Sequence, residues 1–158
     1  MYDLIKLINA NNMSENRRLA AIMFTDIVGY TALMGESESS ALQFLKTNLL
    51  IHQRLVKKYH GKIVKELGDG ILALFENGTE SVLCAIEIQK EARKETIQLR
   101  IGIHEGEVVF KNGDIFGDEV NIASRIQEEC ASGGICISNN VYRIIRNKEG
   151  LKAESIGK

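Results

Sequence analysis

Proline, paired cysteines, excess charge and long hydrophobic runs are all missing from this sequence of 158 residues. Average usage would give about eight prolines in a chain of this length, but their absence indicates no particular function. The three cysteines, Cys84, Cys130 and Cys136, are odd in number and show neither C-x-x-C spacing nor a nearby histidine pair. This pattern argues against a disulfide framework and against a zinc site, and it favours reduced thiols.

Charge and hydrophobicity exclude further classes of partner. Twenty basic and 21 acidic residues give a net charge of −1, so no bulk field favours nucleic acid or an anionic membrane. No apolar run approaches the roughly 20 residues that a membrane span needs, and residues 1–10 carry too little positive charge for a signal peptide. We therefore expect a soluble, cytoplasmic chain, or the cytoplasmic domain of a larger protein. Its length provides for one sizeable core.

Hydrophobic periodicity predicts alternating strands and helices, as in an α/β (α+β) protein. Residues 1–16 are expected to form a leading helix and linker, and residues 17–158 a globular domain. The elements expected in that domain are a strand at 19–24, a helix at 38–59, hairpin strands at 62–67 and 71–75, a helix at 79–92, two strands joined by a glycine bend at 98–110, a helix at 116–129, a strand at 135–138, a helix at 141–146 and the start of a strand at 153–156.

Three strings place carboxylates at the ends of strand-like runs. FTDIVGYT carries Asp26, KELGDG carries Asp69 on a tight turn, and GDIFGDEVNIASR carries Asp114. A lone aspartate at such a place is more often a helix cap or a turn former. Two antiparallel strands can nevertheless bring Asp26 and Asp69 to one end of a sheet, where oxygen ligands suit Mg²⁺ or Mn²⁺. With free amides where the chain turns at Gly29, the pattern indicates metal-assisted phosphoryl chemistry on a nucleotide triphosphate.

Other polar residues stand among apolar neighbours. By the alternation of a strand, Lys65 is expected on the same sheet face as Ile63, where its charge needs a partner or must reach water. Asn121 and Arg125 are four residues apart on a predicted helix and so share one face, either in a groove or in solvent. His104, within RIGIHEGEV, is expected to be a hydrogen-bonded structural residue rather than a general base.

The strings FTDIVGYT, VKELGDG, RIGIHEGEV and GDIFGDEVNIASR resemble the signatures of class III nucleotidyl cyclase catalytic domains, the adenylyl and guanylyl cyclases. They follow in the family's order and spacing from about Arg17 to Lys158. The resemblance implies a ferredoxin-like, palm-type fold with a largely antiparallel sheet and flanking helices, working as a homodimer. The string ASGG stands where relatives often have proline, and the family's terminal strands are missing after Gly157, so we expect a domain truncated there.

The resemblance implies a metal and phosphate site. Asp26, Asp69 and the Ile27 carbonyl would bind two divalent cations, Mg²⁺ or Mn²⁺. The backbone amides of five consecutive residues would hold the phosphates. These residues are Ile27, Val28, Gly29, Tyr30 and Thr31.

The resemblance also implies a base-reading pair and a catalytic pair. Lys65 and Asp114 would read the purine, while Asn121 would orient the ribose and Arg125 would neutralise charge on the α-phosphoryl group. Adenine offers an acceptor at N1 and a donor at N6, which a lysine and an aspartate complement, whereas guanine reverses both. Guanylyl cyclases of the family carry glutamate and cysteine at these positions. The bacterial-type adenylate cyclase reaction, from ATP to cyclic AMP and pyrophosphate, is therefore expected.

In this family the two halves of a site come from different protomers, the aspartates Asp26 and Asp69 from one and the other four residues from its partner. Two alternatives stay open: a catalytically silent cyclase-fold module and a guanylate cyclase. A silent module would be expected to lack a metal aspartate or the arginine, and this sequence lacks neither. A GG(D/E)EF string and a P-loop are both absent, which disfavours a diguanylate cyclase and a P-loop NTPase. Fusion to a regulatory or membrane domain is compatible with the leading helix.

Overall fold

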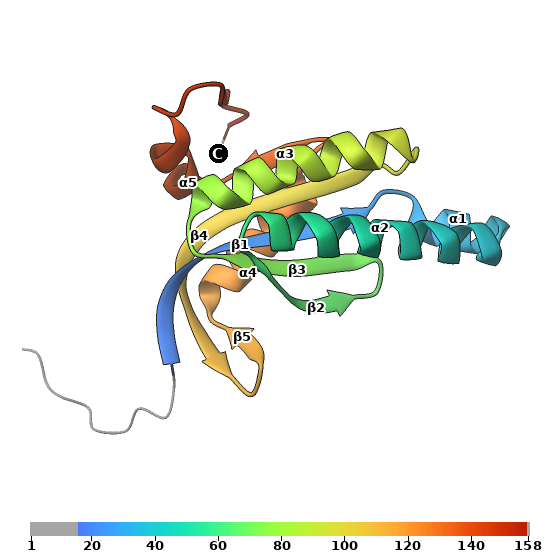
Figure 1. Ribbon diagram of the computed structural model, residues 1–158, viewed down its shortest axis with the longest axis horizontal. Coiled ribbons are helices and arrows are strands. Elements are labelled where there is room, and N and C mark those ends of the chain that lie inside the picture. Colours follow the sequence, from blue (N-terminus) through green and yellow to red (C-terminus); the bar gives the residue numbers. More distant parts are fainter. Residues whose placement is uncertain (1–15, 158) are drawn as a thin grey trace, which may run out of the picture.

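The computed structural model describes residues 16–157 (Figure 1). The leading helix and linker expected at 1–16 lie outside this range except for Asn16. The elements are β1 (Asn16–Ile27), α1 (Tyr30–Glu36), α2 (Glu38–Lys58), β2 (Lys62–Leu67), β3 (Gly70–Phe75), α3 (Gly78–Lys94), β4 (Leu99–Lys111), β5 (Asp114–Phe116), α4 (Asp118–Glu129), β6 (Ile135–Ile137) and α5 (Asn139–Ile145).

Six strands of the described chain form one sheet in the order β2-β3-β1-β4-β5, and β6 pairs with the opposite end of β4 from β5. All pairs are antiparallel except β4 with β6. Helices α2, α3 and α5 cover one face of the sheet and α4 covers the other (Figure 1). The expected α/β fold, with a largely antiparallel sheet and flanking helices, is confirmed.

Strand alternation builds a separate core on each face of the sheet. Along β1, Met23 and Ile27 pack toward α2 and α3, while Ala20 and Ile22 pack toward α4. Fully burying a side chain such as Ile22 stabilises the fold by about 1.5–3 kcal/mol. The two cores therefore fix the direction of every side chain along β1, including the polar ones near its end.

Helices α2 and α3 begin at side-chain caps. The Ser37 side chain accepts a hydrogen bond from the Ser40 amide at the start of α2. The Asn77 side chain accepts one from the Glu80 amide at the start of α3. Such caps satisfy amides that have no partner within the helix. None of the helices within residues 16–157 is long and apolar enough to cross a membrane.

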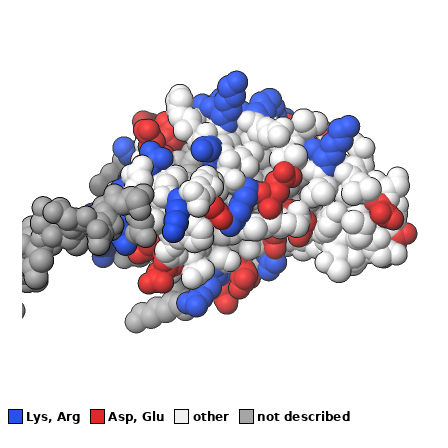
Figure 2. Space-filling view, turned by 90° about the horizontal axis from the view of Figure 1, so that it is seen from below, with Lys and Arg blue, Asp and Glu red and all other residues white. Residues whose placement is uncertain are grey.

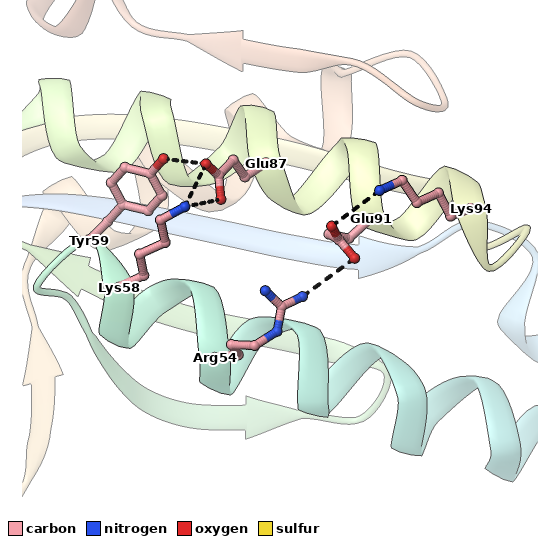
Figure 3. A network of polar contacts seen from close by, with 6 residues as sticks. All are labelled: Arg54, Lys58, Tyr59, Glu87, Glu91 and Lys94. Atoms are coloured by element: carbon pink, nitrogen blue, oxygen red, sulfur yellow. Dashed lines mark hydrogen bonds and ion pairs between the residues drawn. The ribbon is translucent and has the colours of Figure 1, made fainter.

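Polar contacts join α2 and α3 on the outer surface (Figure 3). Glu87 accepts hydrogen bonds from the Tyr59 hydroxyl at 2.6 Å and from Lys58 at 2.9 Å, and Arg54 pairs with Glu91 at 3.4 Å. The bond to Glu87 raises the pKa of Tyr59 to about 12. Exposed ion pairs contribute about 0–1 kcal/mol each, so the buried apolar faces provide most of the stability of this contact.

The bend expected within 98–110 is wrong, because β4 runs unbroken for 13 residues. Its glycines serve helix packing instead. A Cβ atom on Gly102 would collide with the backbone of Gln127, and one on Gly106 would lie 2.6 Å from the carboxyl group of Glu119. The two glycines therefore let α4 rest directly on β4.

Other boundaries also differ from those expected. The first strand is twice as long as the predicted 19–24, and the unpredicted helix α1 precedes α2. The strand expected from residue 153 is wrong, because residues 151–157 have no regular secondary structure.

Candidate active site

The structure brings Asp26 and Asp69 together at the end of β1. Asp26 is the penultimate residue of β1, and Asp69 lies in the turn between β2 and β3. The Asp69 carboxylate accepts a hydrogen bond from the amide of Ile27 at 3.1 Å. A Cβ atom on Gly70 would lie 2.9 Å from the carbonyl oxygen of Thr25, so the turn approaches β1 this closely only because residue 70 is glycine.

Arg100 is the closest charged partner of Asp26 that the structure records. The two residues are paired across β1 and β4. The Arg100 guanidinium donates to both Asp26 carboxylate oxygens, from Nη2 at 2.8 Å and from Nε at 3.2 Å. This contact raises the pKa of Arg100. Sequence reasoning missed this residue, although the antiparallel pairing of RIGIHEGEV with FTDI would have placed it opposite Asp26.

Two of the five candidate phosphate-binding amides already donate hydrogen bonds within the chain. Ile27 donates to the Asp69 carboxylate, and Val28 donates to the carbonyl oxygen of Gln98 at 2.8 Å. The other three lie where α1 begins, in a turn whose amides have no partner within the helix. These residues are Gly29, Tyr30 and Thr31.

Lys65 and Asp114, which are 49 residues apart in the sequence, form an ion pair with Nζ 3.1 Å from Oδ2. The other carboxylate oxygen of Asp114 accepts a hydrogen bond from the Ile115 amide at 2.7 Å. The pKa of Asp114 is lowered, first by this amide and then by Lys65. The two residues proposed to read the base are therefore held together within one chain.

A β-bulge determines where Lys65 points. Ile63 pairs with Ala73, but Lys65 pairs with Leu72, so the register shifts by one residue between them. Paired residues share a sheet face, and Ala73 and Leu72 belong to the cores on opposite faces. The expectation that Lys65 shares a face with Ile63 is therefore wrong. The bulge turns Lys65 to the face on which α4 packs.

Asn121 and Arg125 lie together on the exposed side of α4. Ala123 and Gln127 on the same helix are buried, and Ala123 packs against the sheet. The two candidate catalytic residues thus share one face, as their spacing predicts, and this face is open to solvent. It adjoins Ile122, whose side chain is 36% exposed.

His104 is hydrogen-bonded at both ring nitrogens, as expected for a structural histidine. Its Nδ1 lies 2.7 Å from the hydroxyl of Ser138, and its Nε2 contacts the carboxylate of Glu119. Its side chain is only 6% exposed. A histidine bound in this way holds β4, α4 and the start of α5 together.

The oxygen ligands at the end of β1 suit a cation that is also coordinated by oxygens of a bound ligand or of water. Within residues 16–157, no group of three or more His, Cys, Asp or Glu side chains gathers into a metal site. Asp26, Asp69 and the Ile27 carbonyl supply oxygen alone, which Mg²⁺ and Mn²⁺ prefer. Mg²⁺ commonly binds through one or two carboxylates together with substrate phosphates and water. The residues present therefore fit a divalent cation held jointly with a phosphate ligand.

Charges of both signs are mixed over the face shown in Figure 2, where blue and red side chains alternate without a large patch of either. This face therefore carries no broad field of one sign that would attract an anionic ligand.

These features define a class of protein: an α/β domain with a carboxylate pair at one strand end, a lysine–aspartate pair nearby in the sheet and an amide–guanidinium pair on a helix. A sequence model of the adenylate and guanylate cyclase catalytic domain matches residues 13–158. The chain belongs to this family.

Solved and curated relatives agree with this assignment. An adenylate cyclase from Streptomyces coelicolor is 31% identical over 95% of this chain. The structure of an adenylate/guanylate cyclase/hydrolase from Silicibacter pomeroyi is 36% identical, with a TM-score of 0.81 over 91% of this chain and 89% of that one. The adenylyl cyclase CyaB from P. aeruginosa is 27% identical, with a TM-score of 0.78 over 86% and 84% of the two chains. The chain spans about a quarter to two fifths of the length of the first curated relatives.

Proposed function

We propose that residues 17–158 form an adenylate cyclase domain that converts ATP to 3′,5′-cyclic AMP and pyrophosphate. The observation that carries this proposal is the pair of Lys65 and Asp114, whose side chains meet at 3.1 Å on the α4 side of the sheet. Support also comes from the adenylate cyclase names of the Streptomyces and P. aeruginosa proteins.

The choice of purine follows from hydrogen-bond polarity. Lys65 donates and Asp114 accepts, which matches N1 and the N6 amino group of adenine. Guanine would place a donor against the lysine and an acceptor against the carboxylate. Each buried polar group left unpaired in this way costs about 1–3 kcal/mol, so the pair discriminates strongly against GTP.

The chemistry proposed is an in-line displacement at the α-phosphorus. The ribose 3′-oxygen forms a bond to phosphorus, the bond to the β-phosphate oxygen breaks, and pyrophosphate leaves with the bonding electrons while the hydroxyl proton is released. Asn121 orients the ribose, and Arg125 stabilises the charge that develops on the phosphoryl oxygens. Two divalent cations held by Asp26, Asp69 and the Ile27 carbonyl would supply activation of the 3′-hydroxyl and binding of the triphosphate.

We propose further that the active site is shared between two copies of this chain. Asn121 and Arg125 are exposed, as expected for groups that complete a site on another protomer. Two large apolar side chains at strand ends are exposed as well: Phe116, the last residue of β5, is 51% exposed, and Leu67, the last residue of β2, is 45% exposed. Mixing the inactive variants Asp26→Ala and Arg125→Ala would build one intact site in each heterodimer, so recovered activity is expected, and a mixture without any would contradict a shared site.

Turnover of ATP with Mg²⁺ or Mn²⁺, followed through both cyclic AMP and pyrophosphate, tests the proposed activity. Equal amounts of the two products are expected. Binding of ATP without either product would identify a silent nucleotide-binding module, and a product formed from GTP alone would identify a guanylate cyclase.

A further inference from the structure

We propose that His104 and Glu119 are positioning residues that set where α4 presents Asn121 and Arg125. This inference rests on the proposed function, because it concerns how the catalytic pair is held. It comes from a hydrogen-bonded link between the buried His104 on β4 and the partly exposed Glu119 in the first turn of α4.

The link has a defined hydrogen-bond direction. A carboxylate only accepts, so Nε2 of His104 carries the hydrogen that is donated to Glu119. The Nδ1 atom contacts the Ser138 hydroxyl, which also caps α5 by accepting from the Val141 amide. The imidazole is thus held from both sides, and it presents one directional donor to α4.

Packing contributes few side chains to the contact between α4 and β4. Ala123 and Gln127 are the buried residues of α4, and Gly102 and Gly106 of β4 offer no side chain against which the helix could lock. The helix also begins at Gly117, which provides no side-chain cap. A directional bond near this uncapped end is therefore well placed to fix the register of the helix.

A second polar contact holds the other end of α4. Arg100, which binds Asp26, also donates from Nη1 to the carbonyl oxygen of Glu128 at 3.2 Å. Asn121 and Arg125 lie between the two contacts, two and six residues after Glu119. Loss of the Glu119 contact should let this part of the helix shift, and a displacement of about 1 Å at a catalytic group can cost about 10²-fold in rate.

The first test compares Glu119→Ala with Glu119→Gln. The glutamine keeps an oxygen that accepts from His104, whereas alanine removes the acceptor. We expect kcat to fall at least about tenfold in Glu119→Ala with a much smaller change in KM, because Arg125 acts on charge that develops in the transition state. Glu119→Gln should restore most of kcat. Glu129→Ala, an exposed change on the same helix, is the control for lost charge.

A second test separates positioning from general stability by combining Glu119→Ala with the Asp26→Ala and Arg125→Ala mixture. Placed on the Asp26→Ala chain, the change lies on the α4 that completes the intact site, and activity should fall at least about tenfold. Placed on the Arg125→Ala chain, it lies on an α4 that serves no intact site, and activity should match the parent mixture.

Equal losses in the two mixtures, or full kcat in the Glu119→Ala homodimer, would overturn the inference. Thermal unfolding of each variant shows whether a loss reflects unfolded protein. An inactive parent mixture would count against the proposed shared site, and the alanine and glutamine comparison in the homodimer would then decide the role of Glu119 by itself.

Discussion

Arg100 on β4 and Asp26 on β1 lie opposite each other, and the guanidinium donates to both oxygens of the carboxylate. The positive charge of Arg100 thereby lies directly against the Asp26 carboxylate. A cation that binds Asp26 must share the carboxylate oxygens with Arg100 or displace the guanidinium from them. It also enters a site that already contains a positive charge.

Replacing Arg100 with glutamine should therefore strengthen metal binding in the absence of nucleotide. Two unit charges about 4 Å apart interact with about 4 kcal/mol at an effective dielectric constant of 20. Because solvent screens part of this, we expect about a tenfold tighter Kd for Mn²⁺, measured from the spin-resonance signal of the free ion. Arg54→Gln, on the opposite face of the sheet, should leave Mn²⁺ binding unchanged. Unchanged or weaker binding in Arg100→Gln would refute this interpretation of the pair.

His52 on α2 is buried behind the strand end that carries Asp26. Its Nδ1 lies 2.8 Å from the carbonyl oxygen of Asn48, and its Nε2 lies 2.9 Å from the hydroxyl of Thr25. A carbonyl only accepts, so Nδ1 carries the hydrogen and Nε2 accepts from Thr25. Burial lowers the pKa of His52 to about 4 from its ordinary 6.5.

This lowered pKa predicts a loss of stability in acid. As pH falls below 6.5, His52 becomes protonated in the unfolded chain but stays neutral in the folded chain until about pH 4. Protonation therefore favours the unfolded chain, and the loss of folding stability grows as pH falls through this window. The contribution between pH 7 and 4.5 is about 2–3 kcal/mol. Urea unfolding of His52→Gln at both values should show a correspondingly smaller acid loss than the parent. Equal acid losses in the two proteins would contradict the assignment.

Arg125 should affect turnover without affecting the fold. Its side chain is exposed on α4, so Arg125→Ala should unfold at the same temperature as the parent. Removing one donor of this kind typically costs 10² to 10³ in rate, or about 3–4 kcal/mol, and we expect a loss of this size in kcat. Arg143→Ala on α5 provides the matched control. Retained turnover in Arg125→Ala would rule out the proposed role.

Exchanging the base-reading pair should change the substrate preference. In the double variant Lys65→Glu and Asp114→Cys, the side chains match guanine better than adenine by hydrogen-bond polarity. The ratio of kcat/KM for ATP to that for GTP should fall at least about tenfold. Lys62→Glu, an exposed change on the same strand, should leave the ratio as it was. A double variant that keeps the parent ratio would show that these two residues do not select the base.

The sequence predicted what local patterns determine. Apolar runs and Gly-Asp-Gly located β1, β2 and β3, and the helical spacing of Asn121 and Arg125 placed both on one face of α4. The meeting of Asp26 and Asp69 could be predicted because each lies where a strand-like run ends in a turn.

Relationships between segments were harder to predict. The bulge that turns Lys65 away from Ile63 depends on the register with β3, which strand alternation alone does not contain. Gly102 and Gly106 look like bends in the sequence, but β4 continues through them because it is paired with β1, and the close approach of α4 explains why they are glycines. The pairing of Arg100 with Asp26 likewise requires the alignment of β1 with β4.

Competition between ATP and GTP at equal concentration, in the presence of Mn²⁺ or Mg²⁺, tests the central claim most directly. The account predicts that cyclic AMP and pyrophosphate form and that cyclic GMP is at most a minor product, because Lys65 and Asp114 match adenine. Preferred formation of cyclic GMP, or no cyclic nucleotide from a folded protein, would contradict it.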